Sequence, residues 1–134
     1  MTAIAVTAAK VAAQIDTVTR SYIAAEAITA GQAVYTLAAG TVGVADANGS
    51  GTQQFFGIAI NAATTGEAVL VAHKGIVDGF APAGNAGSLV YLSDTVGGLD
   101  TAAGSMTVAV GKVIVRSDAT KTIYFDTQWL ADWS

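Results

Sequence analysis

The chain has 134 residues, of which 52% are hydrophobic and only 12% are charged, well below the roughly 25% that is typical of soluble globular proteins. This composition excludes general disorder, because disordered chains are poor in apolar residues and rich in charge. The net charge is −4, and the six lysines and arginines are spread singly along the sequence, which argues against nucleic-acid binding. The chain has no cysteine, which excludes disulfides and thiol chemistry, and it has no apolar run long enough to form a membrane-spanning helix.

Residues 1–25 form the first predicted unit, an extended N-terminal arm. Residues 7–15 have good helix propensity, but an isolated helix of this length is marginal. Residues 16–24 fit an extended strand. The arm is mildly basic, whereas the remainder of the chain is acidic. We expect the first dozen residues to be mobile in the free protein and to become ordered against a partner.

An internal repeat relates residues 31–72 to residues 87–126. The first copy contains Gly31-Gln-Ala-Val-Tyr35, Thr41-Val-Gly-Val-Ala-Asp46, Phe56-Gly-Ile-Ala-Ile60 and Glu67-Ala-Val-Leu-Val71. The second copy contains Gly87-Ser-Leu-Val-Tyr91, Thr95-Val-Gly-Gly-Leu-Asp100, Val110-Gly-Lys-Val-Ile114 and Lys121-Thr-Ile-Tyr-Phe125. Because four blocks recur in the same order at nearly constant spacing, we interpret the body of the chain as a duplicated unit.

Each copy is rich in short β-branched or aromatic runs, and clusters of Gly, Asn, Asp and Thr separate these runs. This pattern predicts short strands joined by turns. Many short strands at roughly ten-residue spacing are typical of a small sandwich or barrel. We therefore predict a mainly β fold, a small β-sandwich or barrel built from the duplicated unit, in a domain of residues 26–134.

Catalytic and metal-binding motifs are not evident in the sequence. His73 is the only histidine, and its place before Lys74 and Gly75 predicts a surface or turn position at the end of a strand. No Gly-x-Ser-x-Gly motif marks a nucleophilic serine. Residues 46–52 resemble part of a calcium loop, but position 12 of that loop is Gly57 where an EF-hand requires glutamate. We therefore expect no enzymatic activity, no cofactor and no metal.

Asp46 and Asp100 occupy equivalent positions in the two copies of the repeat. Aspartate is favoured in turns because its carboxylate accepts hydrogen bonds from nearby backbone N–H groups. A pair of equivalent turn residues favours a structural role over a single asymmetric active site.

The last six residues contain both tryptophans, Trp129 and Trp133. Their spacing of four places them on one face of a helical turn. They either fold back and cap the barrel or anchor an interface, where tryptophan is enriched. On the arm, Val18, Arg20 and Tyr22 share one face of the expected strand. The candidate interface residues are Ile4, Val6, Lys10, Val11, Arg20, Tyr22, Trp129 and Trp133.

The chain resembles the capsid cement proteins, the head decoration proteins of tailed bacteriophages. The likeness centres on Gly57-Ile-Ala-Ile-Asn-Ala-Ala-Thr-Thr-Gly-Glu-Ala-Val-Leu-Val71, which is closed by Gly75-Ile-Val77. Two flanking segments are also similar, Ala30-Gly-Gln-Ala-Val-Tyr35 and Ala86-Gly-Ser-Leu-Val-Tyr-Leu-Ser-Asp-Thr95. The resemblance covers about residues 26–126, and the two tryptophans are not part of it.

This resemblance implies a small β-rich virion protein that binds the outer face of the expanded capsid and stabilises it. It implies an N-terminal arm that becomes ordered on the shell, and it carries over no catalytic residue. The expected partners are the major capsid protein and further copies of this chain, as a homotrimer or alternatively a dimer, with no nucleic acid and no membrane. The expected location is the capsid exterior of the virion, after synthesis in the bacterial host cytoplasm. A tail or fibre β-module and a carbohydrate-binding or adhesion module are the alternatives.

Overall fold

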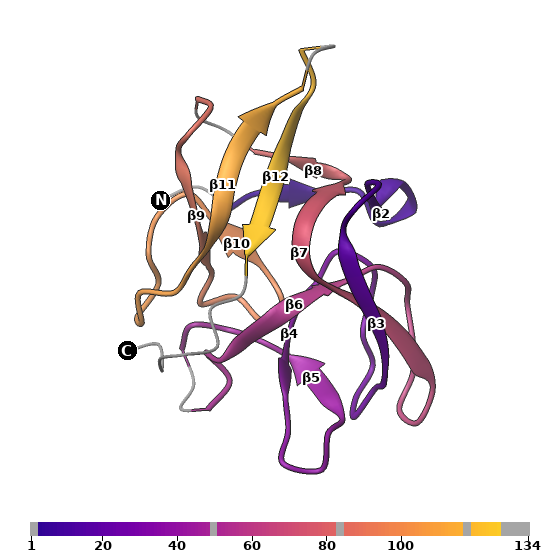
Figure 1. Cartoon of the computed structure of the whole chain (residues 1–134). Helices are drawn as coiled ribbons and strands as arrows, with labels where there is room; N and C mark the ends of the chain where they lie inside the picture. Colours follow the sequence, from indigo (N-terminus) through magenta and orange to yellow (C-terminus); the bar gives the residue numbers. More distant parts are fainter. Residues whose placement is uncertain (1–2, 49–50, 83–84, 117–118, 127–134) are drawn as a thin grey trace.

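A computed structural model describes residues 3–48, 51–82, 85–116 and 119–126, which form short strands and one 3₁₀ turn, η1 (Ala8–Lys10). The strands are β1 (Ala5–Val6), β2 (Ala12–Ala13), β3 (Val18–Ile23), β4 (Ala33–Thr36), β5 (Val42–Val44), β6 (Phe55–Ala59), β7 (Ala68–Asp78), β8 (Phe80–Ala81), β9 (Leu89–Leu92), β10 (Leu99–Asp100), β11 (Ala109–Val115) and β12 (Lys121–Asp126). The predicted mainly β class is confirmed, with one long antiparallel sheet that curls into a barrel-like body (Figure 1).

The two copies of the repeat have the same strand topology. In the first copy, β4 pairs with β5 and β6, and β6 pairs with β7; in the second, β9 pairs with β10 and β11, and β11 pairs with β12. Antiparallel pairing of β7 with β12 joins the two halves into one sheet, with the order β10-β9-β11-β12-β7-β6-β4-β5. In Figure 1 the first copy forms the lower half of the molecule and the second copy the upper half.

The register at the centre of each copy is also repeated. Val34 lies opposite Gly57 in the first copy, and Val90 lies opposite Gly111 in the second. In both strand pairs the pairing register shifts by one residue, so that it passes over the residue immediately before this glycine. The same bulge at equivalent positions indicates that the sequence repeat corresponds to a duplicated supersecondary unit.

Gly57 and Gly111 are required by the close approach of the neighbouring strand. A Cβ atom at Gly57 would lie 2.4 Å from the carbonyl oxygen of Ala72, and a Cβ atom at Gly111 would lie 2.1 Å from that of Tyr124. Because these are backbone atoms, a side chain there would force the two strands apart. This constraint explains why both copies carry glycine at the same position.

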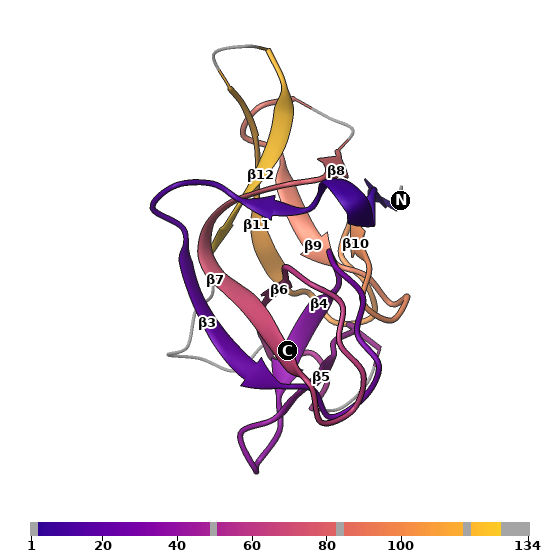
Figure 2. The same cartoon turned by 90° about the vertical axis from the view of Figure 1, so that its right-hand side faces the viewer.

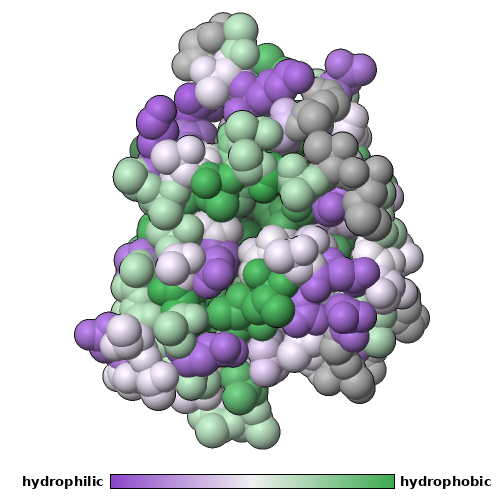
Figure 3. Space-filling view, turned by 180° about the vertical axis from the view of Figure 1, so that it is seen from behind, coloured by the Kyte–Doolittle hydropathy of each residue, from purple (hydrophilic) through white to green (hydrophobic). Residues whose placement is uncertain are grey.

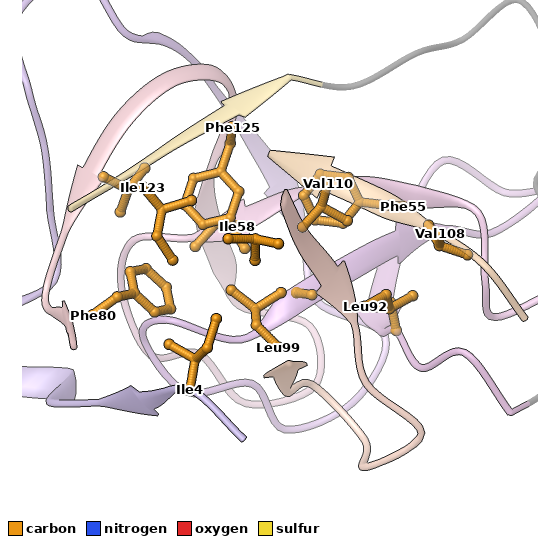
Figure 4. Packing of buried hydrophobic residues seen from close by; sticks show 14 of the residues in the cluster. Ile4, Phe55, Ile58, Phe80, Leu92, Leu99, Val108, Val110, Ile123 and Phe125 are labelled. Atoms are coloured by element: carbon orange, nitrogen blue, oxygen red, sulfur yellow. The ribbon is translucent and has the colours of Figure 1, made fainter. Parts of the chain in front are cut away.

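Two apolar clusters form the interior, and equivalent residues of the repeat contribute to each. The smaller core contains Val69 and Val71 of β7, and the larger core contains their equivalents in β12, Ile123 and Phe125. All nine buried residues of the smaller core lie between positions 24 and 71. The larger core takes residues from both copies, and Figure 4 shows Ile4 from the N-terminal segment pointing into it.

The N-terminal segment pairs with the first copy through β3. This strand runs antiparallel to β7, and the next residue, Ala24, bridges Val42 of β5 in a parallel sense. The backbone N–H of Ala25 donates to the carbonyl oxygen of Val42 at 2.8 Å. β3 and the residues after it therefore connect the two outer strands of the curled first copy.

The beginning of the segment pairs in a similar way with the second copy. Ala3 bridges Asp100 of β10, and the N–H of Ile4 donates to the carbonyl oxygen of Leu99 at 2.9 Å. β1 then pairs with β8, and β2 pairs with the far end of β7. Ile4 is buried, with 8% of its surface exposed.

Residues 1–25 were expected to form an extended arm before a β-domain that begins at residue 26, and the described part of this segment pairs with both copies of the repeat. The strand expected at residues 16–24 is present as β3, but it belongs to the main sheet. Residues 7–15, expected to have helical propensity, contain the single 3₁₀ turn η1 followed by the short strand β2. The physical reason is that each curled copy leaves unpaired backbone groups along an outer strand, and the N-terminal strands satisfy those groups.

Candidate interaction surface

β3 is an edge strand of the described structure, and a tight turn precedes it. We call residues 15–23 the β3 edge. Within the described residues, β3 pairs with β7 on one side only, so alternate N–H and C=O groups on its other side face outward. Figure 2 shows β3 at the outside of the body, next to β7. Such an edge is a template for pairing with another chain.

Three aliphatic side chains make this edge apolar. Ile15 is 91% exposed, Val18 is 52% exposed and Ile23 is 47% exposed. Arg20 is the only charged residue within β3. β3 lacks the proline and lysine residues with which edge strands commonly prevent pairing.

A tight turn holds Ile15 in its exposed position. The N–H of Thr17 donates to the carbonyl oxygen of Gln14 at 3.2 Å, and Asp16 has a φ of +69°. Aspartate tolerates this left-handed conformation better than most residues. The hydroxyl of Thr17 also donates to the carbonyl oxygen of Ile76 at 3.1 Å, which fixes the turn against β7.

The side chain of His73, in β7, connects β3 to the rest of the sheet by hydrogen bonds. Its Nδ1 lies 2.7 Å from the carbonyl oxygen of Phe56, and its Nε2 lies 2.7 Å from the hydroxyl oxygen of Tyr22. Because a carbonyl oxygen only accepts, Nδ1 carries the hydrogen and Nε2 accepts from the Tyr22 hydroxyl. The rings of Tyr22 and Phe56 also meet edge to face, with centroids 5.1 Å apart. One imidazole therefore connects β6, β7 and β3.

Burial lowers the pKa of His73 from its ordinary value of 6.5, and this effect outweighs the hydrogen bond to Phe56, which raises the pKa. The positive charge of Arg20 lowers the pKa further. His73 is therefore mainly neutral at pH 7, the state in which Nε2 accepts from the Tyr22 hydroxyl.

The prediction that His73 lies at the surface or in a turn is wrong, because the residue is only 3% exposed. β7 does not end near Gly75 but continues to Asp78, since its second half pairs with β12 and β2. Gly75 is an interior strand residue with a φ of +129°, and a Cβ atom there would lie 2.8 Å from the Cα of Thr17. This glycine permits a close approach between chain segments and does not mark a strand end.

The predicted interface residues of the first dozen positions contact the body to different degrees. Ile4 is buried in the larger core, which removes it from the surface. Val6 is 42% exposed, and Val11 packs partly against the larger core. Both valines lie over Gly31, where a Cβ atom would meet Val6 Cγ2 at 2.5 Å. Lys10 is exposed on η1.

The remaining predicted interface residues fall into two groups. Arg20 and Tyr22 lie together on the β3 edge, where Arg20 is exposed and Tyr22 is half-buried against His73. Trp129 and Trp133 lie outside the described residues. Ile15 was missed by the sequence analysis, because its neighbours gave no sign that a turn would expose it.

The carboxylates of the repeat have local structural partners. Asp46 accepts from the N–H of Asn48 at 2.9 Å, and Asp100 accepts from the N–H of Ala102 at 3.1 Å, two residues further on in each case. These matching turns agree with the structural role that the repeat indicates. Within the described part of the chain, no three His, Asp or Glu residues cluster closely enough to hold a metal ion. The same residues include no helix of sufficient length and apolarity to cross a membrane.

Comparisons of this chain with protein-family models, with curated proteins and with solved structures find no match.

Proposed function

We propose that this chain is a non-enzymatic structural protein of a tailed-phage virion, which binds the outer surface of the capsid and stabilises the mature shell. The observation that carries the proposal is the β3 edge, a strand that within the described residues pairs on one side only and carries exposed aliphatic side chains. An edge of this kind is suited to permanent coverage by another protein, since open apolar edges on free proteins promote aggregation.

The resemblance to capsid cement proteins also supports this proposal, because it lies in the strands that hold β3 in place. Its central run, residues 57–77, lies in β6, the following turn and β7. These strands hold His73 and therefore position β3. The similar flanking segments include β4 and β9, the equivalent strands of the two copies. The residues that carry the resemblance thus form the support of the candidate surface.

Attachment would occur by strand addition. A segment of the major capsid protein would pair with the outer backbone groups of β3, and Ile15, Val18 and Ile23 would pack against it. Burial of an aliphatic side chain stabilises a complex by roughly 1.5–3 kcal/mol. A protein that binds only the mature lattice stabilises that state by mass action, and many modest contacts add up over a shell. Self-association as a trimer, or as a dimer, is part of the same proposal.

The exposed side chains of the described residues give less support to the alternative functions, a carbohydrate-binding module and a tail or fibre module. Sugar-binding modules need exposed aromatic platforms, whereas the large hydrophobic side chains exposed here are all Val, Ile or Leu. Figure 3 shows one face of the body, where the apolar surface is divided into patches by hydrophilic side chains. A tail or fibre module would use the same β3 edge on a different partner, and the test below distinguishes the two locations.

A binding assay on capsids that lack this chain tests the proposal. We expect the purified protein to decorate such capsids, and we expect Ile15→Asp to weaken binding by roughly ten- to a hundredfold, the equivalent of one buried aliphatic contact. Val96→Asp is the matched control, because Val96 is 57% exposed outside the β3 edge. Equal binding by both variants would contradict the role of the β3 edge. Binding to tails but not to capsids would favour the tail module.

A further inference from the structure

The strand pairings extend the duplication by one strand beyond the sequence repeat. Val71 of β7 lies opposite Arg20 of β3 in the first copy. Its equivalent in the second copy, Phe125 of β12, lies opposite Gly75 of β7. The residue pairs on either side of these two match in the same way. β3 is therefore equivalent to the second half of β7, so β7 ends the first copy and also begins the second.

In the second copy, β2 covers the outer edge of this strand. Val77 of β7 pairs with Ile123 of β12 on one side and with Ala13 of β2 on the other. The N–H of Gln14 donates to the carbonyl oxygen of Ile76 at 2.9 Å, which extends the contact by one residue. Figure 1 shows β2 and β3 beside β7. A short antiparallel strand therefore completes the second copy.

The corresponding edge of the first copy is open within the described residues. The backbone of Tyr22, at the equivalent position, pairs with β7 alone. The N–H of Ala24 also points toward β7, because it donates to the carbonyl oxygen of Glu67 at 2.9 Å. Since backbone groups alternate along a strand, those of Ser21 and Ile23 face outward. These are the groups with which an added strand would pair.

Two side chains of β3 define which added strand fits. Ile23 stands where the second copy has Asp78, which accepts from the side chain of Gln14. An aliphatic residue, rather than a polar one, therefore matches Ile23, which is 47% exposed. Arg20 stands where the second copy has Gly75, and among the described residues it forms no ion pair. An acidic residue opposite Arg20 would add a favourable cross-strand pair.

We propose that the β3 edge binds an extended segment of the capsid protein as an antiparallel strand, with an aliphatic residue opposite Ile23 and an acidic residue opposite Arg20. The segment takes the place in the first copy that β2 takes in the second. β3 of a second copy would fit less well, because it contains no acidic residue. The inference rests on the proposed function, which supplies the capsid as the source of the segment.

A short probe peptide tests the chemistry of the pairing without capsids. Its sequence is acetyl-Thr-Val-Val-Ala-Thr-Glu-Thr-amide, which sets its second valine opposite Ile23 and its glutamate opposite Arg20. NMR titration of the full-length protein measures its affinity. We expect saturable binding, about two- to tenfold tighter than that of the same peptide with lysine in place of glutamate, because opposite charges attract across a strand pair and like charges repel.

A charge-reversed variant shows whether Arg20 is the residue that selects the peptide. Arg20→Glu should reverse the preference, so that the lysine peptide binds more tightly than the glutamate peptide. Lys112→Glu is the matched control, because it makes the same charge change at an exposed position of β11 and should leave the preference as it is in the wild-type protein. Melting temperatures of both variants establish that they are folded.

A nitroxide label at the amino end of the glutamate peptide tests the direction and the register. In the antiparallel arrangement this end lies beyond Ile23, so the label should broaden the amide signal of Ala24 more than that of Thr19. Amide exchange gives a second readout. Binding should slow the exchange of Ile23, whose N–H faces outward, and leave that of Tyr22 unchanged, because the N–H of Tyr22 already faces β7.

Absence of saturable binding, equal affinity of the two peptides for the wild-type protein, or stronger broadening of Thr19 than of Ala24 would each overturn the proposal. Slow exchange of Ile23 in the free protein would do the same, because the edge would already be covered by this chain or by a second copy. A protein that decorates capsids but does not bind the peptide contradicts this inference alone. One that binds the peptide but not capsids contradicts the capsid role while supporting the pairing.

Discussion

Tyr22 on β3 donates a hydrogen bond of 2.7 Å to Nε2 of His73, the one histidine of the chain, which is buried in β7. This bond connects the exposed edge strand to the interior of the sheet. The other ring nitrogen of His73 is bonded to Phe56 of β6, so the stability of the β3 edge is linked to the protonation state of one imidazole.

The first prediction concerns pH. Burial lowers the pKa of His73 in the folded protein below the 6.5 of the unfolded chain, so the unfolded state binds more protons at mildly acidic pH. The contribution of His73 to the free energy of unfolding is therefore fully present above pH 6.5 and is lost as the pH decreases below that value. The loss is at most about 1.4 kcal/mol per pH unit.

Melting temperatures measured between neutral and mildly acidic pH check this prediction. The slope should disappear in His73→Gln, which keeps polar groups at the site but does not titrate. Wild-type stability that stays constant, or increases, on acidification through this range would contradict the assignment of a neutral buried imidazole.

Tyr22→Phe removes the hydroxyl that contacts His73 and keeps the ring that packs on Phe56. We expect a loss of about 1 kcal/mol in the free energy of unfolding, the usual contribution of one hydrogen bond, and faster amide exchange in β3. Tyr91→Phe is the control, because Tyr91 is also half-buried on a strand but lies in the other copy, away from His73. Equal losses in the free energy of unfolding for the two variants would contradict a specific contribution of the hydrogen bond between Tyr22 and His73.

Gly111→Ala tests the close approach of β11 and β12. Its Cβ would lie 2.1 Å from the carbonyl oxygen of Tyr124, so the strands must separate, and we expect the free energy of unfolding to fall by roughly 1–3 kcal/mol or more. The control is Gly98→Ala, where the nearest atom would lie at 3.3 Å. Chemical denaturation measures both. If Gly111→Ala is as stable as the control, the two strands are not in the described register.

Ile4→Ala tests whether the N-terminal segment belongs to the folded body of the free protein. Ile4 is 8% exposed in the larger core, and truncation of such a side chain typically costs about 2–5 kcal/mol. Val96→Ala, at an exposed position, should change the free energy of unfolding very little. An unchanged melting temperature for Ile4→Ala would instead favour a mobile arm that orders only on a partner.

The sequence was sufficient to predict the fold class and the duplication, because both depend on local patterns. The shared glycines, the β-branched runs and the turn residues recur at fixed offsets, and the two copies accordingly have the same topology and the same bulge beside Gly57 and Gly111. β3 was also predictable from its extended pattern. The match of Asp46 with Asp100 follows from the same repeat.

Other features depend on contacts between distant segments, and no local pattern reveals them. The pairing of residues 3–25 with both copies arises because the curled sheets leave outer strands to be completed. His73 is buried because β7 continues past Gly75, a residue that in the sequence alone suggests a strand end.

The most direct test of the proposed role is the copy number of this chain in purified virions, measured by gel densitometry against the major capsid protein. A capsid cement predicts a ratio near one copy per capsid subunit, since the protein would cover the whole shell. A handful of copies would place the chain in the tail or at a vertex, and its absence from virions would contradict the proposed function altogether.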